Sequence, residues 1–162
     1  MFQAQRSGDY IFRIITELSL EVDTTRFQKA WDDVVAMVPI LRTRIVELPG
    51  QGLVQVVFMF RPSDWNQASS IEEHQRREKE QECNQRAMCT GMPLIRLGLI
   101  ESSGRRFFGW TLHHALYDGW SLPLIQRAVE QIYHTAKPSQ LVPLQPSVKY
   151  SKNKSSQLTD AF

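Results

Sequence analysis

Apolar and polar residues alternate through residues 10–20, which is the two-residue period of a half-buried β-strand. The apolar residues that follow recur at intervals of three and four, the period of an amphipathic helix. They are Phe27, Ala30, Trp31, Val34 and Val38. Asp23 stands where it can cap the N-terminus of this helix, and Pro39 ends it.

Two hairpins are predicted further along the chain, because the turn-forming segments 49–52 and 102–105 each separate two apolar segments. The strands are residues 42–48 and 53–60 in the first hairpin, and residues 94–101 and 106–113 in the second. A helix is predicted at residues 121–135. Its apolar stripe consists of Leu122, Ile125, Val129 and Ile132.

Another helix is predicted between the two hairpins. Ser69 and Ser70 precede Glu72 and Glu73 at the spacing of a capping box, and Gly91 follows the last predicted turn near residue 89. Because this helix is almost entirely polar, we expect it at the periphery, with a solvated face rather than a docking surface.

Together these elements predict an α+β fold, a two-layer sandwich in which a mixed β-sheet carries helices on one face. Residues 1–136 are expected to form the folded unit. Residues 137–162 contain three prolines and then a run rich in serine and lysine, so they are expected to form an extended linker.

Composition excludes several classes of function. The 162 residues suit one domain, and 42% hydrophobic residues suffice for a core. A net charge of +2 favours neither nucleic acid nor an anionic membrane as a partner, and no run approaches the roughly 18 apolar residues of a membrane span. We therefore expect a cytoplasmic protein. Cys83 and Cys89 are expected to be free thiols, because no third ligand stands at metal-site spacing.

Candidate chemistry gathers in the run HHALYDG, from His113 to Gly119, between the last predicted strand and the helix at 121–135. Histidine can take up and release a proton near neutral pH. Successive side chains of an extended segment face opposite ways, so only one of His113 and His114 is expected to face a given cavity. The other histidine is expected to pack.

Three neighbouring residues have expected structural roles. Gly119 is expected to adopt a positive φ or to allow a close backbone approach. Ser121 is expected to be the N-cap of the following helix. Trp120 is expected either to line a substrate channel or to pack into the core.

The run LHHALYDGWS resembles the HHxxxDG motif of condensation domains in nonribosomal peptide synthetases, which extends the HxxxDG motif of chloramphenicol-acetyltransferase-like acyltransferases. The residues within and around the motif are similar to those of the fungal branch of the family. Three upstream segments are similar to family landmarks and occur in family order. They are VPILRTRI at 38–45, where only the LRT core of the family's RHExLRTxF carries over, LVQVV at 53–57 and PLIRL at 93–97. The resemblance implies the N-terminal lobe of a condensation domain within residues 1–136, incomplete at its start and lacking the second lobe.

The resemblance also implies roles for individual residues. His114 takes the place of the second histidine, whose ring accepts a hydrogen bond from the attacking amine, while His113 packs. Asp118 either orients His114 in a triad or, as we prefer, forms a structural ion pair that fixes the loop. Arg42 of the LRT core is the first choice of partner for this carboxylate, and Arg96 the second.

The implied activity is amide bond formation between a carrier-bound acyl or peptidyl thioester and an aminoacyl acceptor. The implied partners are the second lobe, an adenylation domain of the parent chain, and carrier proteins whose phosphopantetheine holds the substrates. No cofactor is expected to bind directly. The chain alone is expected to be inactive, because a single lobe leaves His114 at an open surface.

The sequence also leaves other functions open. They are a related HxxxDG acyltransferase or chain-terminating cyclising domain, a non-catalytic recruitment or platform domain, and metal binding by His113, His114 and Asp118. Opposed histidine faces disfavour the metal site. The intact motif disfavours a degenerate platform, and a heterocyclising domain would carry a DxxxxD pattern instead.

Overall fold

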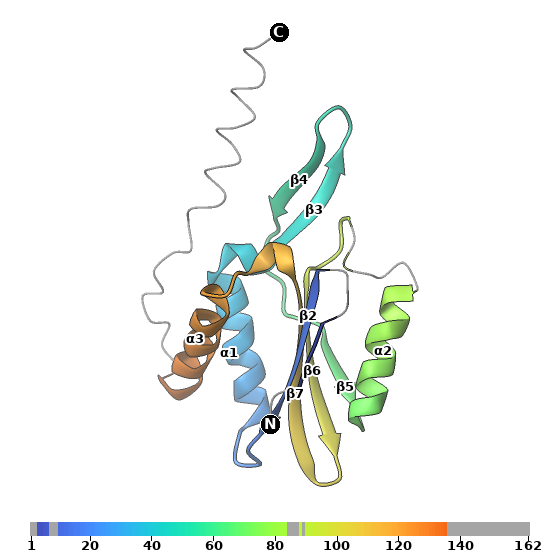
Figure 1. Cartoon of the computed structure of the whole chain (residues 1–162). Helices are drawn as coiled ribbons and strands as arrows, with labels where there is room; N and C mark the ends of the chain where they lie inside the picture. The colour runs from blue at the N-terminus through green and yellow to red at the C-terminus, as the bar shows by residue number, and fades with distance from the viewer. Residues whose placement is uncertain (1–2, 7–9, 84–87, 89, 136–162) are drawn as a thin grey trace.

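A computed structural model describes residues 3–6, 10–83, 88 and 90–135 of the chain. Five strands form the main sheet in the order β1-β2-β7-β6-β5, and two more form a separate antiparallel pair (Figure 1). The main-sheet strands are β1 (Gln3–Arg6), β2 (Ile11–Leu18), β5 (Trp65–Ala68), β6 (Ile95–Ser102) and β7 (Arg105–His113). Strand β5 runs parallel to β6, while the other neighbours are antiparallel. The mixed sheet of an α+β fold is thus confirmed.

Most of the predicted elements are found close to their expected bounds. They include α1 (Thr24–Met37), α3 (Ser121–Thr135) and the hairpin of β3 (Thr43–Leu48) and β4 (Gly52–Val57). Asp23 caps α1 as predicted, because its carboxylate accepts the backbone N–H of Arg26 at 3.0 Å. Strands β1 and β5 were not predicted, and a short 3₁₀ turn, η1 (Pro39–Arg42), separates α1 from β3.

The apolar core lies between the main sheet and helices α1 and α3. The ring of Trp31 on α1 lies 5.1 Å, centroid to centroid, from the rings of both Phe108 and Trp110 on β7. Because side chains alternate along a strand, these two contacts turn the intervening Gly109 toward the opposite face of the sheet. A further element must therefore pack against that second face of the sheet.

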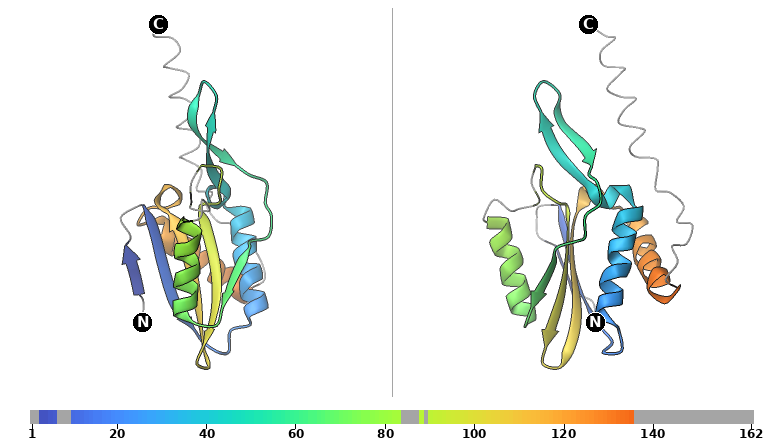
Figure 2. Two further views of the ribbon diagram at one scale, coloured as in Figure 1. Left: turned by 90° about the vertical axis from the view of Figure 1, so that its right-hand side faces the viewer. Right: turned by 180° about the vertical axis from the view of Figure 1, so that it is seen from behind.

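Helix α2 (Ile71–Cys83) covers this second face, so the expectation that all helices lie on one face is corrected (Figures 1 and 2). The imidazole of His74, only 5% exposed, lies against the paired glycines Gly98 and Gly109. The physical reason is the parallel pairing of β5 with β6, which requires a connection that crosses a face of the sheet. Helix α2 is that crossing.

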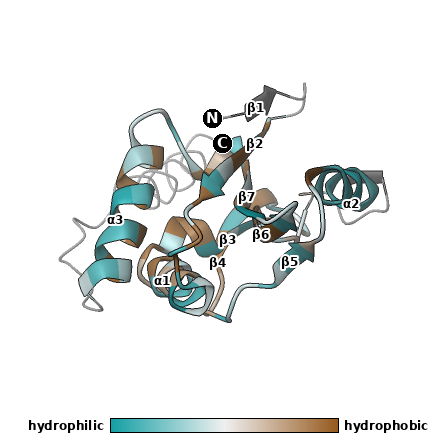
Figure 3. Ribbon diagram, turned by 90° about the horizontal axis from the view of Figure 1, so that it is seen from below, coloured by the Kyte–Doolittle hydropathy of each residue, from teal (hydrophilic) through white to brown (hydrophobic). Residues whose placement is uncertain are grey.

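A buried polar layer lies between α2 and the sheet, and we define it as His74 and Glu78 of α2 and Arg96 of β6. Arg96 Nη1 lies 3.3 Å from Glu78 Oε2, and both side chains are largely buried. Seen from below, α2 is hydrophilic over most of its surface, whereas α1 presents hydrophobic residues (Figure 3). The expectation of a solvated face therefore holds for the outer side of α2 but not for its inner side.

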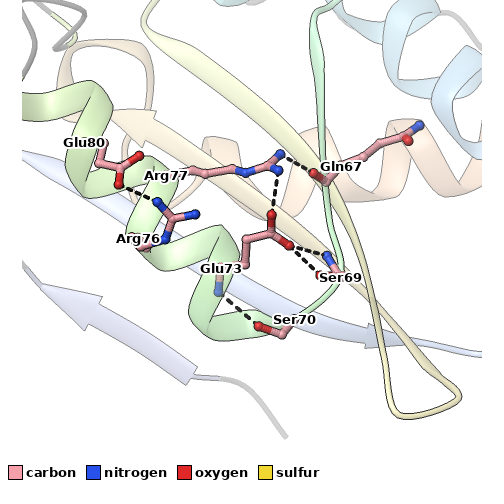
Figure 4. A network of polar contacts seen from close by, with 7 residues as sticks. All are labelled: Gln67, Ser69, Ser70, Glu73, Arg76, Arg77 and Glu80. Carbon is pink, nitrogen blue, oxygen red and sulfur yellow. Dashed lines mark hydrogen bonds and ion pairs between the residues drawn. The ribbon is translucent and has the colours of Figure 1, made fainter.

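The start of α2 is fixed by the predicted capping box (Figure 4). Ser70 Oγ accepts the N–H of Glu73 at 3.1 Å, and Glu73 Oε2 accepts the hydroxyl and the N–H of Ser69 at 2.6 and 2.7 Å. These bonds, led by the Ser69 hydroxyl, lower the pKa of Glu73 to about 2. The predicted end of this helix near residue 89, the free thiols expected at Cys83 and Cys89, and the linker expected at 137–162 fall on residues or side chains outside those described.

The β3–β4 hairpin stands away from the main sheet (Figure 1). Arg44 joins it to the segment before β6 by donating to the carbonyl of Gly91 at 3.1 Å. Across the part of the chain that the structure describes, no helix combines the length and apolarity needed to cross a membrane.

Candidate functional site

The motif occupies the junction between the sheet and α3. Strand β7 ends at His113, a 3₁₀ turn η2 (His114–Leu116) follows, and α3 begins at Ser121. The backbone is held on both sides at this point. The N–H of His113 donates to Leu94 O at 2.9 Å, and the N–H of His114 donates to Tyr10 O at 2.6 Å. The neighbouring chain segments before β6 and β2 therefore fix where the two histidines lie.

The two histidines have different environments. His113 is half-buried, and its Nδ1 accepts the backbone N–H of Ala115 at 3.1 Å. Burial and, second, the proximity of His114 lower the pKa of His113. Because Nδ1 accepts a hydrogen bond, Nε2 is the nitrogen that carries the proton of the neutral ring. His114 is exposed instead, and its ring stacks on Tyr117 with centroids 4.7 Å apart and planes 7° from parallel.

A hollow of about 510 Å³ opens beside the pair and is lined by Tyr10, His113, His114 and Ala115. The expectation that only one of the two histidines faces a given cavity is therefore corrected, because β7 ends at His113 and the alternation of a strand does not extend into the turn that begins at His114. The hollow is large enough to admit a substrate group. Since Nδ1 of His113 is already occupied by the Ala115 N–H, the exposed ring of His114 is the better placed of the two to receive a hydrogen bond from a bound amine.

Asp118 acts as a helix cap. Its Oδ1 accepts the backbone N–H of Ser121 at 2.8 Å and that of Trp120 at 3.1 Å. The Ser121 hydroxyl reciprocates by accepting the N–H of Asp118 at 2.8 Å and donating to its carbonyl at 3.1 Å. The hydrogen bonds to Asp118, led by that from the Ser121 backbone, lower the pKa of its carboxyl. The expectation that Ser121 caps α3 is corrected, because Asp118 accepts the bonds at the helix start.

The expected ion pair between Asp118 and Arg42 is not formed among the described residues. Arg42 Nη1 donates instead to the carbonyl of Phe58 at 2.6 Å, and Arg96, the second choice, pairs with Glu78. The physical reason is that the Asp118 carboxylate is exposed and is already satisfied by two backbone donors, so it needs no buried cation. Nor is a triad hydrogen bond formed between the described side chains of Asp118 and His114.

Two further expectations are corrected after Asp118. The φ of Gly119 lies outside the left-handed region, and a Cβ added there would meet nothing within 4 Å. Neither reason expected for this glycine therefore holds within the described chain. Trp120 is 86% exposed, so it does not pack into the core. Its role in lining a channel stays a prediction.

Sequence reasoning missed Tyr10 as part of the site. Its place beside His114 depends on the antiparallel pairing of β2 with β7, which brings residues about one hundred positions apart together. Among the described residues, no three histidine, cysteine, aspartate or glutamate side chains come close enough to hold a metal ion. With Nδ1 of His113 bonded to Ala115, the geometry lends no support to a metal site at the motif.

Curated relatives are synthetases much longer than this chain. Nonribosomal peptide synthetase ungA of Aspergillus violaceofuscus is 43% identical over 132 residues, which are 80% of this chain and 1% of the relative. Nonribosomal peptide synthetase dtxS1 of Metarhizium robertsii is 43% identical over 129 residues, 80% of this chain and 2% of the relative. The chain thus spans a very small part of these relatives.

Solved structures support the same fold. The X-domain from teicoplanin biosynthesis superposes with a TM-score of 0.67 at 19% identity, over 94% of this chain and 34% of that one. The condensation domain that mediates chain release from the enacyloxin polyketide synthase superposes with a TM-score of 0.62 at 18% identity, over 94% of this chain and 30% of that one. The family model described as "Condensation domain" matches residues 3–160. A match over nearly the whole chain, together with the position of the motif, shows that this chain belongs to the condensation-domain family.

Proposed function

We propose that this chain supplies the histidine-bearing part of an amide-forming site in a larger nonribosomal peptide synthetase, and that His114 contacts the reacting amine. One observation carries the proposal: the two adjacent histidines differ in exposure and in hydrogen bonding. Both residues line the hollow, but His113 is half-buried and its Nδ1 accepts the N–H of Ala115, whereas His114 is exposed. The names of the curated relatives support the choice of a synthetase.

The proposed reaction joins a donor thioester to an acceptor amine. The amine nitrogen attacks the thioester carbonyl carbon, a C–N bond forms, and the C–S bond then breaks to release a thiol. An α-amino group with a pKa near about 8 is partly neutral at pH 7, so it can attack without a strong base. His114 would accept the hydrogen bond of the amine, take its proton as the C–N bond forms, and return a proton to the leaving sulfur.

The proposal includes the partners that such a reaction needs. Donor and acceptor would be held on the phosphopantetheine arms of carrier proteins, with an adenylation domain supplying the acceptor, in the cytoplasm. A second lobe would close the hollow and exclude water, which strengthens electrostatic interactions at His114. In this view Asp118 holds the start of α3, and so the end of the motif, rather than touching the substrate.

The test compares His114→Ala with His113→Ala in the complete condensation domain that contains this chain. The assay is amide release from two loaded carrier proteins, with thermal unfolding of each variant in parallel. We expect His114→Ala to lower the rate by about 100- to 10,000-fold with little change in Tm. We expect His113→Ala to lower Tm, because it removes the acceptor of the Ala115 N–H. Equal losses of rate with unchanged Tm for both variants would contradict the assignment.

A second comparison separates this function from a recruitment platform. A platform would bind loaded carriers without forming an amide, and His114→Ala would leave its affinity for carriers unchanged. The chain of residues 1–162 should also form far less amide than the complete domain, because it lacks a surface to hold the thioester near His114. Comparable turnover by the two would mean that the site is complete within these residues.

A further inference from the structure

Tyr10 has a backbone conformation that its residue type disfavours. Its φ is +53°, and the other described non-glycine residue with a positive φ is Ser103, at +51°. Ser103 is followed by Gly104, also at positive φ, in the two-residue turn between β6 and β7. A two-residue hairpin turn of type I′ requires a positive φ at both positions, so the conformation of Ser103 is ordinary turn geometry.

Tyr10 has no glycine partner of that kind and carries a bulky aromatic side chain, for which a left-handed backbone is uncommon. Such strained residues persist where the surrounding structure holds them, and they often occur at functional sites. A backbone hydrogen bond holds Tyr10, because its carbonyl accepts the N–H of His114 at 2.6 Å. The bond continues the pairing of β2 with β7 one step past Ile11 and His113.

Tyr10 and His114 meet at the same hollow. Both residues line it, and Tyr10 is 73% exposed although it is aromatic. An exposed ring offers a flat apolar surface at low conformational cost, and a phenol hydroxyl at its edge. The hydrogen bond from the His114 N–H to the Tyr10 carbonyl joins the two backbones at the hollow, so an exposed aromatic residue is the direct cross-strand neighbour of His114.

We infer that Tyr10 is a specificity-determining residue of this site, and that its ring forms a wall against which the acyl side chain of a carrier-bound thioester lies. The inference rests on the proposed function. An amine in contact with His114 attacks a carbonyl within bonding distance, so the substituents on the reacting carbon lie within a side-chain length of His114. Tyr10 lines that space, and an apolar substituent buried against its ring is removed from water.

Four variants of the complete domain test the ring separately from the backbone. Tyr10→Phe keeps the ring and removes the hydroxyl, while Tyr10→Ala removes the ring. Tyr10→Gly removes the ring and the backbone strain together. Ser103→Gly is the matched control, because it relieves a similar φ at the far end of β7.

The first readout is kcat/KM for donor thioesters with alanyl, leucyl and phenylalanyl side chains, and then for the same series as acceptors. We expect Tyr10→Ala to change the preference for the large over the small side chain by about tenfold, the scale of an apolar pocket contact. The effect should fall on one series, donor or acceptor, and so identify which substrate lies against the ring. Tyr10→Phe and Ser103→Gly should keep the preference of the wild type.

The second readout is the affinity of amide-linked acyl-pantetheine analogues, measured by calorimetry, which needs no turnover. Tyr10→Ala should weaken binding of the analogue with the large side chain about tenfold more than that of the small one. Equal effects of Tyr10→Ala on all substrates and analogues, or effects matched by Ser103→Gly, would overturn the inference. If His114→Ala abolishes amide formation while Tyr10→Ala keeps the wild-type preference, only this inference fails. If His114→Ala leaves the rate unchanged, the proposed function fails, and the calorimetry still decides the role of Tyr10.

Discussion

A methyl group added at Gly109 should test how α2 packs on the sheet. The Cβ of an alanine at this position would lie 2.6 Å from Nε2 of His74 and 3.0 Å from its Cε1. Distances this short force something to move. The imidazole is almost fully buried, and the neighbouring Gly98 touches the same ring, since a Cβ there would lie 2.9 Å from Cε1. The ring therefore has little room to turn away, and α2 itself must shift.

The magnitude follows from two opposing effects. Forcing an extra carbon into a packed site costs about 1–3 kcal/mol. Replacing glycine by alanine within a strand gains about 0.5–1 kcal/mol, because the unfolded chain loses conformational freedom. For Gly109→Ala we therefore expect the free energy of unfolding to fall by about 1 kcal/mol, the difference between the middles of these two ranges.

Urea unfolding monitored by tryptophan fluorescence is a suitable assay, because Trp31 and Trp110 are buried in the core. Gly119→Ala is the matched control, since a Cβ at that position meets nothing within 4 Å. The cause is tested by repeating Gly109→Ala in a His74→Ala background, where the added carbon has room and its cost should vanish. Equal stability of the Gly109→Ala and Gly119→Ala chains, or an undiminished cost without the imidazole, would refute the reasoning.

Three further measurements address the helix ends and the buried histidines. Burial lowers the pKa of His74 and of His113 in the folded chain, so the unfolded chain binds more protons below pH about 6.5, and the free energy of unfolding should fall from pH 7 to pH 5. His74→Gln should make that fall shallower, and an unchanged slope would contradict it. Asp118→Ala and Arg42→Ala should have additive effects on the free energy of unfolding in a double-mutant cycle, whereas coupling would mean that they pair after all. Ser70→Ala should lower the free energy of unfolding by about 1 kcal/mol, measured by urea titration, because it removes the cap of α2.

The sequence predicted the elements with a clear hydrophobic period and missed those without one. Helix α1 and strands β2 and β7 carry apolar residues at regular intervals, and all three lie close to their expected bounds. Strand β5 has four residues, Trp65 to Ala68, and two of them are polar amides. Because β5 was not recognised, the parallel β5–α2–β6 unit was not recognised either. The polar helix was then expected at the periphery, although a parallel pair requires a helix that covers the sheet.

The buried side of α2 shows why hydrophobicity alone was insufficient. His74 and Glu78 are four residues apart, so they lie on one side of the helix, but both are polar and give no apolar stripe. What receives His74 is the absence of side chains at Gly98 and Gly109, two glycines paired across β6 and β7. Two isolated glycines in predicted strands do suggest a close approach of another group. Which group approaches depends on strand register, which the sequence alone did not provide.

The sequence predicted that both histidines and the acid lie at the junction of a strand and a helix, but not their contacts. His113 and His114 differ in exposure and in hydrogen bonding, but strand alternation is not the reason, because β7 ends at His113, His114 begins a 3₁₀ turn, and both residues line the hollow. The resemblance implied that Asp118 pairs with Arg42 or Arg96, but Arg42 contacts Phe58 and Arg96 contacts Glu78. A carboxylate three residues before a helix start finds backbone donors locally, at 2.8 and 3.1 Å, without any long-range contact. The competing local capping bond was the better physical choice.

Strand register links the stability of the core to the geometry of the site. Strand β7 pairs with β2 so that Ile11 lies opposite His113, and Trp110 faces Trp31 in the core. Because the side-chain period of a strand is two, a slip by one residue would turn His113 to the other face of the sheet and would displace the turn that begins at His114. The same slip would turn Trp110 out of the core. Displacing the two histidines in this way therefore requires breaking the aromatic core, so the packing that stabilises the fold also fixes where His113 and His114 meet the hollow.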